Sequence, residues 1–134
     1  MLYGAESWPM NSKIEQQITA TEMKFLRKTA NKTRRDHERN ARIREELKTN
    51  PIVDCISTKQ LKWYGHVKRM GKERIPRKCL EVRMEGKRSR GRPRTSWMDN
   101  INNHVKKRHK TMREADKLTQ DRKEWRKFTE SPTP

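Results

Sequence analysis

The apolar residues of this chain are sparse, and they recur at the spacing of one face of an α-helix. The clearest stripe consists of Ile52, Ile56, Trp63, Val67 and Met70. Side chains three, four or seven residues apart share a helix face. Only 29% of the 134 residues are hydrophobic, so the helices can share only a modest core. The sequence therefore predicts a mostly α fold of about four or five short helices, loosely packed and partly disordered.

Capping patterns mark the starts of the first and last expected helices. Ser12 and Thr111 are each followed three residues later by a glutamate. This is the pattern of a capping box, in which a hydroxyl and a carboxylate satisfy each other's backbone N–H groups. The first box predicts a helix over residues 12–30, and the second predicts a last helix that continues through Trp125.

Three further helices are expected between these two. The first is short and begins with Asn40 as its cap. The second is longer, with Pro51 in its first turn and Gly71 at its end. The third lies around residues 97–105, where apolar residues recur at helical spacing. Residues 77–84 fit either a short helix or a strand.

Positive charge dominates the chain. It has 35 Lys and Arg against 17 Asp and Glu, a net charge of +18 and an isoelectric point near 10.5. Such a chain repels itself, so it needs a polyanionic partner or accepts partial disorder. Nucleic acid is the first candidate and an anionic membrane the second, but no apolar run is long enough to span a bilayer. The expected partners are RNA and DNA with low sequence specificity, with no membrane and no small-molecule substrate.

The first basic segment of the expected nucleic-acid-binding site carries Lys62, Lys68 and Arg69. Such cations contact phosphates with little regard to sequence. The neighbouring aromatics Trp63 and Tyr64 leave two interpretations open, because they could stack on unpaired bases or fill a helical core. We expect a core position for Trp63.

The second basic segment contains the sharpest local motif. Residues 90–93 read Arg-Gly-Arg-Pro, the core of an AT-hook, whose arginines enter the narrow minor groove of A·T-rich DNA. Gly91 would let the backbone approach the groove floor, and Pro93 would keep the chain extended. The same loop could instead bind phosphates in general or act as a nuclear import signal. The expected binding residues here are Lys87, Arg88, Arg90, Gly91, Arg92 and Arg94.

Patterns of catalytic and metal-binding residues do not stand out. Cys55, His66 and Cys79 are too far apart for a short ligand pair, and His104 and His109 do not supply one,. Acidic residues are scattered, with no Asp-Asp pair to hold the two divalent metals that a polymerase requires. We therefore expect no catalytic residue, no metal and no cofactor, and no enzyme activity from the isolated chain. Two cysteines fit reduced thiols in the nucleus, the expected location, or in the cytoplasm.

Six short blocks occur in a recognisable order. They are residues 2–8 (LYGAESW), 22–27 (EMKFLR), 34–44 (RRD, then Asn40 and Ile43-Arg44), 61–70 (LKWYGHVKRM), 86–101 (GKRSRGRPRTSWMDNI) and 121–126 (DRKEWR). Together they resemble the region after the palm in LINE-type non-LTR retrotransposon endonuclease–reverse transcriptases. The departures are Phe25, where that family often has Trp, and Ser96 and Asn100.

The resemblance covers roughly residues 2–128, and it implies the thumb and C-terminal extension of an RNA-directed DNA polymerase. These parts grip template RNA and target DNA during target-primed reverse transcription. The endonuclease domain and the palm, with its Tyr-x-Asp-Asp metal site, would precede Met1. We therefore expect a nucleic-acid-binding fragment without the catalytic domains. The alternatives are a host-used nuclear DNA- or chromatin-binding protein with an AT-hook-like loop, or a non-functional remnant of such an element.

These expectations divide the chain into four segments. Residues 1–70 form a thumb-like helical region, and residues 71–94 form a basic linker with the AT-hook-like segment. Residues 95–130 form a C-terminal helical region, and residues 131–134 form a disordered tail.

Overall fold

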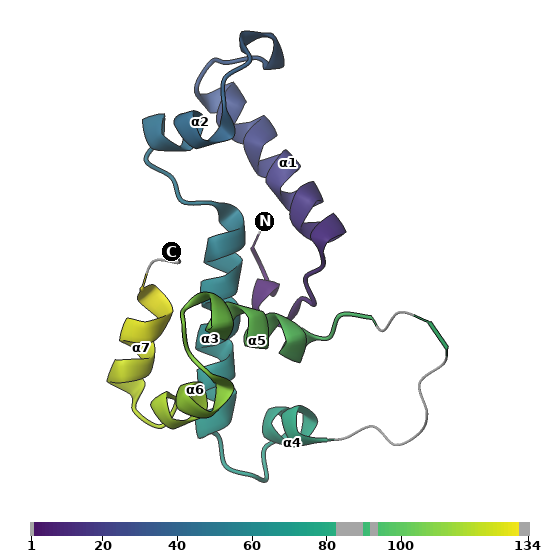
Figure 1. The fold of residues 1–134 in the computed structure, drawn as a ribbon, viewed down its shortest axis with the longest axis vertical. Helices are drawn as coiled ribbons and strands as arrows, with labels where there is room; N and C mark the ends of the chain where they lie inside the picture. Colours follow the sequence, from purple (N-terminus) through teal and green to yellow (C-terminus); the bar gives the residue numbers. More distant parts are fainter. Residues whose placement is uncertain (1, 83–89, 92–93, 132–134) are drawn as a thin grey trace. The chain divides into compact units, whose positions relative to one another are not determined.

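The computed structural model describes residues 2–82, 90–91 and 94–131 (Figure 1). Within these ranges the chain forms seven α-helices, two short 3-10 helices and no strand. The predicted mostly α class is confirmed, although the helices are more numerous than expected. Contacts divide the chain into two compact units. Unit 1 comprises residues 1–9 and 57–134, and unit 2 comprises residues 10–56.

Unit 2 contains α1 (Ser12–Thr29), a 3-10 turn η2 (Arg34–Asp36), α2 (Asn40–Glu46) and the first residues of α3 (Ile52–Arg69). The predicted span of the first helix is confirmed, but its predicted cap is wrong by one residue. Asn11 is the cap, since its side chain accepts a hydrogen bond of 2.9 Å from the backbone N–H of Ile14. Asparagine and serine are about equally good caps, so the two positions compete.

The cap predicted for the second helix is also wrong. Asn40 is the first residue of α2, and Arg39 precedes it as the cap without a side-chain bond. The side-chain oxygen of Asn40 accepts a hydrogen bond of 2.7 Å from Nη2 of Arg27 on α1. The Asn40 amide therefore links α2 to α1 instead of capping α2.

The core of unit 2 is small and surrounds a buried carboxylate. Its buried apolar residues are Met23, Leu26 and Ile43. Beside them, Glu22 on α1 is 8% exposed. Its carboxylate accepts hydrogen bonds from Nη2 of Arg44 on α2 at 2.7 Å and from the backbone N–H of Ile52, the first residue of α3, at 3.0 Å. One side chain thus connects the three helices of the unit.

Unit 1 contains a 3-10 turn η1 (Ala5–Ser7), most of α3, α4 (Ile75–Glu81), α5 (Trp97–Lys107), α6 (Met112–Leu118) and α7 (Arg122–Glu130). Apolar side chains from α3, α5, α6 and α7 meet in one core. The buried members of this core are Leu61, Tyr64, Ile101, Val105, Ala115, Trp125 and Phe128.

Two of these helices differ from the prediction. Of the ambiguous segment 77–84, residues 77–81 belong to the helix α4, and residues 83–84 lie outside the described residues. The helix carries proline in its first turn, where a missing N–H costs nothing,. The single last helix is divided into α6 and α7. The capping box of Thr111 and Glu114 opens α6 as predicted, but Asp121 opens a new helix. Its carboxylate accepts from the N–H groups of Lys123 and Glu124 at 2.7 and 3.2 Å.

The helix α3 faces the core with Tyr64 instead of Trp63. Tyr64 is 1% exposed, whereas Trp63 is partly exposed and lies against the ring of His66 at 5.5 Å between centroids. The expected core position of Trp63 is therefore wrong. The core face of α3 also carries Gly65, where the lack of a side chain lets the indole of Trp125 lie directly against the helix, and Nε1 of Trp125 donates a hydrogen bond of 3.1 Å to the carbonyl of Leu61.

A buried polar chain links α5 to α3 and to the N-terminal segment of unit 1. Nε2 of the Gln60 amide donates to the carbonyl of Trp8 at 2.7 Å, which leaves Oε1 facing Nε2 of His104 at 2.9 Å. Nε2 of His104 must therefore donate in this contact. Burial, together with nearby Lys107 and Arg108, lowers the pKa of His104 to about 4.

We expect the stability of unit 1 to decrease as the pH falls below about 6.5, because His104 is buried in its neutral form,. The pKa of His104 is about 4 in the folded chain against 6.5 when exposed, so on acidification the unfolded chain takes up the proton first. Stability is therefore complete above about pH 6.5 and declines down to about pH 4, by about 3 kcal/mol in total. Urea unfolding at about pH 7 and about pH 5, followed by tryptophan fluorescence, should show about 2 kcal/mol of this loss.

Two variants test whether His104 causes this pH dependence of stability. His104→Gln should flatten the dependence over this range, whereas His109→Asn, which alters an exposed histidine after the same helix, should leave it intact. Equal stability of the unmodified chain at both pH values would contradict the buried neutral state of His104.

Candidate nucleic-acid interface

The three cations predicted on α3 have partners inside unit 1. Nζ of Lys62 lies 3.0 Å from the carboxylate of Glu130, and both side chains are nearly half exposed, at 49% and 44%. Water screens such a pair, so it contributes little to stability. Lys62 can therefore exchange its carboxylate for a phosphate at small cost.

Lys68 is held more firmly. Its Nζ lies 3.1 Å from the carboxylate of Asp116 and 5.7 Å from the centroid of the Tyr64 ring. The Tyr64 hydroxyl donates to the same carboxylate. Burial, and then this hydrogen bond, raise the pKa of Tyr64. Lys68 therefore neutralises a carboxylate that the core tyrosine also uses.

Arg69 satisfies the end of a neighbouring helix. Its Nη1 donates a hydrogen bond of 2.8 Å to the carbonyl of Thr119, directly after α6. Burial, with Arg122 nearby, lowers the pKa of Arg69. Arg77 on α4 acts similarly, since its Nη1 donates to the carbonyl of Lys68 in the last turn of α3 at 2.6 Å. Carbonyls at helix ends need such donors, so part of the positive charge of unit 1 has a structural use.

The AT-hook-like segment is described only in part. Arg90, Gly91 and Arg94 are exposed and lie outside the helices. Gly91 has a φ of +130°, a left-handed conformation that favours glycine. The predicted binding residues Lys87, Arg88 and Arg92 lie outside the described residues, as does Pro93. The choice between a minor-groove hook and a phosphate-binding loop stays a prediction.

A cationic surface that the sequence reasoning did not select lies at the end of α5. Lys106, Lys107 and Lys110 are all exposed, and the ion pairs found among the described residues do not involve them. The run Lys-Lys-Arg at residues 106–108 is a visible signal for it in the sequence. These lysines are better placed to meet phosphate than the engaged cations of α3.

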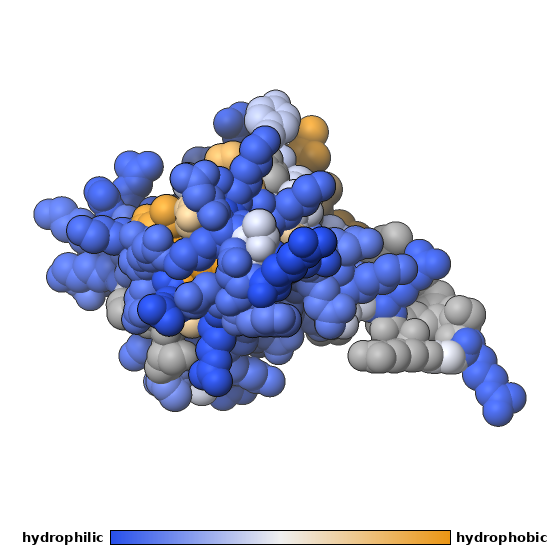
Figure 2. Space-filling model, turned by 90° about the horizontal axis from the view of Figure 1, so that it is seen from above, coloured by the Kyte–Doolittle hydropathy of each residue, from blue (hydrophilic) through white to orange (hydrophobic). Residues whose placement is uncertain are grey.

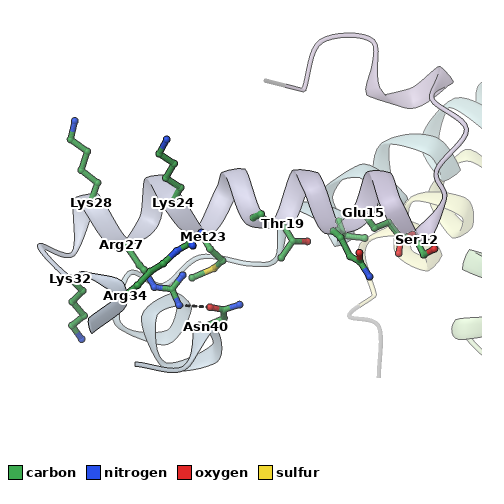
Figure 3. A pocket seen from close by; sticks show the side chains of 13 residues that line it. Ser12, Glu15, Thr19, Met23, Lys24, Arg27, Lys28, Lys32, Arg34 and Asn40 are labelled. Carbon is green, nitrogen blue, oxygen red and sulfur yellow. Dashed lines mark hydrogen bonds between the residues drawn. The ribbon is translucent and has the colours of Figure 1, made fainter. Parts of the chain in front are cut away.

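A second such surface belongs to unit 2. Cations from α1 and the 3-10 turn η2 border a groove of about 780 Å³ (Figure 3).

In unit 1, Trp63 and Trp97 line a smaller pocket of about 430 Å³, so stacking of an unpaired base on Trp63 also stays a prediction. A space-filling view shows a face that is largely hydrophilic, with small apolar patches (Figure 2).

Within the ranges that the structure describes, no group of three His, Cys, Asp or Glu side chains could hold a metal ion. No helix in those ranges has the length and apolar character needed to cross a membrane. Comparisons with protein-family models, with curated proteins and with solved structures found no match to the chain.

Proposed function

We propose that the chain binds RNA and DNA through phosphate contacts, with low sequence preference. The observation that carries this proposal is the group of exposed cations outside the ion pairs of the described residues, including Lys106, Lys107 and Lys110, on a chain with a net charge of +18. An excess of one sign raises the local concentration of a polyanion, and each phosphate contact releases counterions.

The resemblance of the six sequence blocks to LINE-type reverse transcriptases supports a more specific role. We infer that the chain corresponds to the thumb and C-terminal extension of such an enzyme, that it acts in the nucleus, and that it has no catalysis of its own. Primer extension with pure chain, magnesium and nucleotides should give no product. A template-dependent product would contradict this part of the proposal.

The basic loop is tested by two sets of substitutions at Arg88, Arg90, Arg92 and Arg94. Changing all four to Ala should weaken binding about equally on A·T-rich and G·C-rich duplexes, and it should reduce the salt slope by up to about 3.6 if every arginine contacts a phosphate. Changing all four to Lys keeps the charge, so it should largely preserve binding.

The two sets separate the interpretations of the loop. A minor-groove hook needs arginine itself, so the Lys variant would lose affinity mainly on A·T-rich duplexes. Unchanged binding of the Ala variant on every nucleic acid would contradict the assignment of this loop. We also propose that the loop is irregular and that the helices pack loosely, which amide hydrogen exchange would measure.

A further inference from the structure

Unit 2 has a groove whose chemistry differs from that of a flat basic surface. The apolar part of its lining, which we call the floor, includes Ala20, Met23 and Val53. Five cations and one carboxylate, Glu15, also line it. The cations are Lys24, Arg27, Lys28, Lys32 and Arg34.

Two arginines line the groove, and they come from different elements: Arg27 from α1 and Arg34 from η2. Nη2 of Arg27 donates to the side-chain oxygen of Asn40 at 2.7 Å and to the carbonyl of Glu38 at 3.3 Å, which holds the guanidinium while Nη1 and Nε can still donate. In Figure 3, Arg34 extends from the η2 turn toward α1 beside Met23. A guanidinium already held in place loses less conformational entropy when it binds an anion.

The other cations extend the positive rim. Lys24 and Lys28 project together from α1, away from α2 (Figure 3). Nζ of Lys32 lies 2.5 Å from the carboxylate of Glu46, which is 48% exposed, so this pair is screened and exchangeable. A ligand that suits this arrangement combines an apolar, flat part with strongly anionic groups.

We propose that this groove binds an unpaired nucleotide of single-stranded nucleic acid, with its base on the apolar floor, a phosphate on Arg27 and Arg34, and a neighbouring phosphate of the strand on Lys28 at the rim. The proposal rests on the proposed function and gives it a site in unit 2. A volume of about 780 Å³ is within the usual range for ligand pockets of about 300–1,000 Å³. Bases inside a duplex are paired and stacked, so a duplex can reach the rim but cannot place a base on the floor.

The test compares two charge-matched double variants of the full chain. Lys28→Gln with Arg34→Gln removes two cations of the groove. Arg35→Gln with Arg39→Gln removes two exposed cations of the same unit that do not line it. Each is titrated with a labelled oligouridine strand and with a duplex of equal length, and circular dichroism checks the helix content of each.

The groove variant should bind the single strand at least tenfold more weakly at about 50 mM salt, with its salt slope reduced by about 1.4 for two lost contacts. The control pair should change single-strand binding much less, and both variants should affect the duplex similarly. Ala20→Leu, which fills the floor and keeps the charge, should weaken only single-strand binding. A 4-thiouridine strand should crosslink to residues 12–34.

Three results would contradict nucleotide binding in the groove and leave the proposed function intact. These are equal losses for the two charge variants on the single strand, unchanged binding by Ala20→Leu, or crosslinks confined to unit 1. Absence of binding by the unmodified chain to either probe would instead contradict the proposed function itself.

Discussion

Gly65→Ala should lower the free energy of unfolding of unit 1 by at least about 3 kcal/mol, although alanine is the better helix former by about 1 kcal/mol. A Cβ at this position would lie 2.0 Å from Nε1 and 2.4 Å from Cδ1 of Trp125. The indole cannot easily retreat, because it donates to the Leu61 carbonyl and packs against Tyr64 and Phe128, with ring centroids 6.1 and 5.2 Å away. Relief of the clash therefore requires α3 and α7 to separate.

Urea unfolding followed by tryptophan fluorescence measures the stability of unit 1, because all four tryptophans belong to that unit. Gly71→Ala is the matched control, since a Cβ there would meet nothing within 4 Å. It should change stability by no more than about 0.5 kcal/mol. Equal stability of Gly65→Ala and the unmodified chain would contradict the close approach of α7 to α3.

Glu22→Ala should have the largest effect in unit 2, about 3–5 kcal/mol. The substitution leaves the guanidinium of Arg44, whose side chain is 17% exposed, without its carboxylate. It also removes the acceptor of the first N–H of α3. Removal of one partner from a largely buried ion pair costs far more than the pair itself contributes.

Loss of far-ultraviolet circular dichroism on heating measures this change, because unit 2 contains no tryptophan. Glu45→Ala removes an exposed carboxylate from the same unit and should leave the melting curve nearly unchanged. A Glu22→Ala variant that melts at the same temperature as the Glu45→Ala variant would show that the Glu22 carboxylate does not connect the three helices.

The sequence predicts most of the helices of this fold because each has its own local signal. The apolar stripe of α3 and the box at Thr111 needed no tertiary information. The choice between Trp63 and Tyr64 required tertiary information, because both are aromatic and adjacent. Tyr64 and Gly65 lie on the core face through their contacts with Trp125, sixty residues after Gly65. The break between α6 and α7 had a local signal in Asp121, an acceptor that competes with continuation of the helix.

The candidate interface was harder to predict, because charge in a sequence does not reveal which cations are already engaged. Lys68 and Arg69 belong to a dense basic segment, yet one pairs with Asp116 and the other binds the carbonyl of Thr119. The groove of unit 2 could not be read from spacing either. Its cations come from α1, from the segment after it and from η2, and only the turn between the two helices brings Arg34 toward Met23.

The proposed binding of nucleic acid through phosphate contacts is tested most directly by the affinity of the chain for one duplex and one single strand as salt rises from about 50 to 200 mM. If about six phosphate contacts form, the affinity for the duplex should fall about 10³-fold over this range and that for the single strand about 300-fold, with the logarithm of the affinity linear in the logarithm of the salt concentration. Random-sequence and A·T-rich duplexes should give similar slopes. No binding at about 50 mM salt, or an affinity that does not change with salt, would contradict the account.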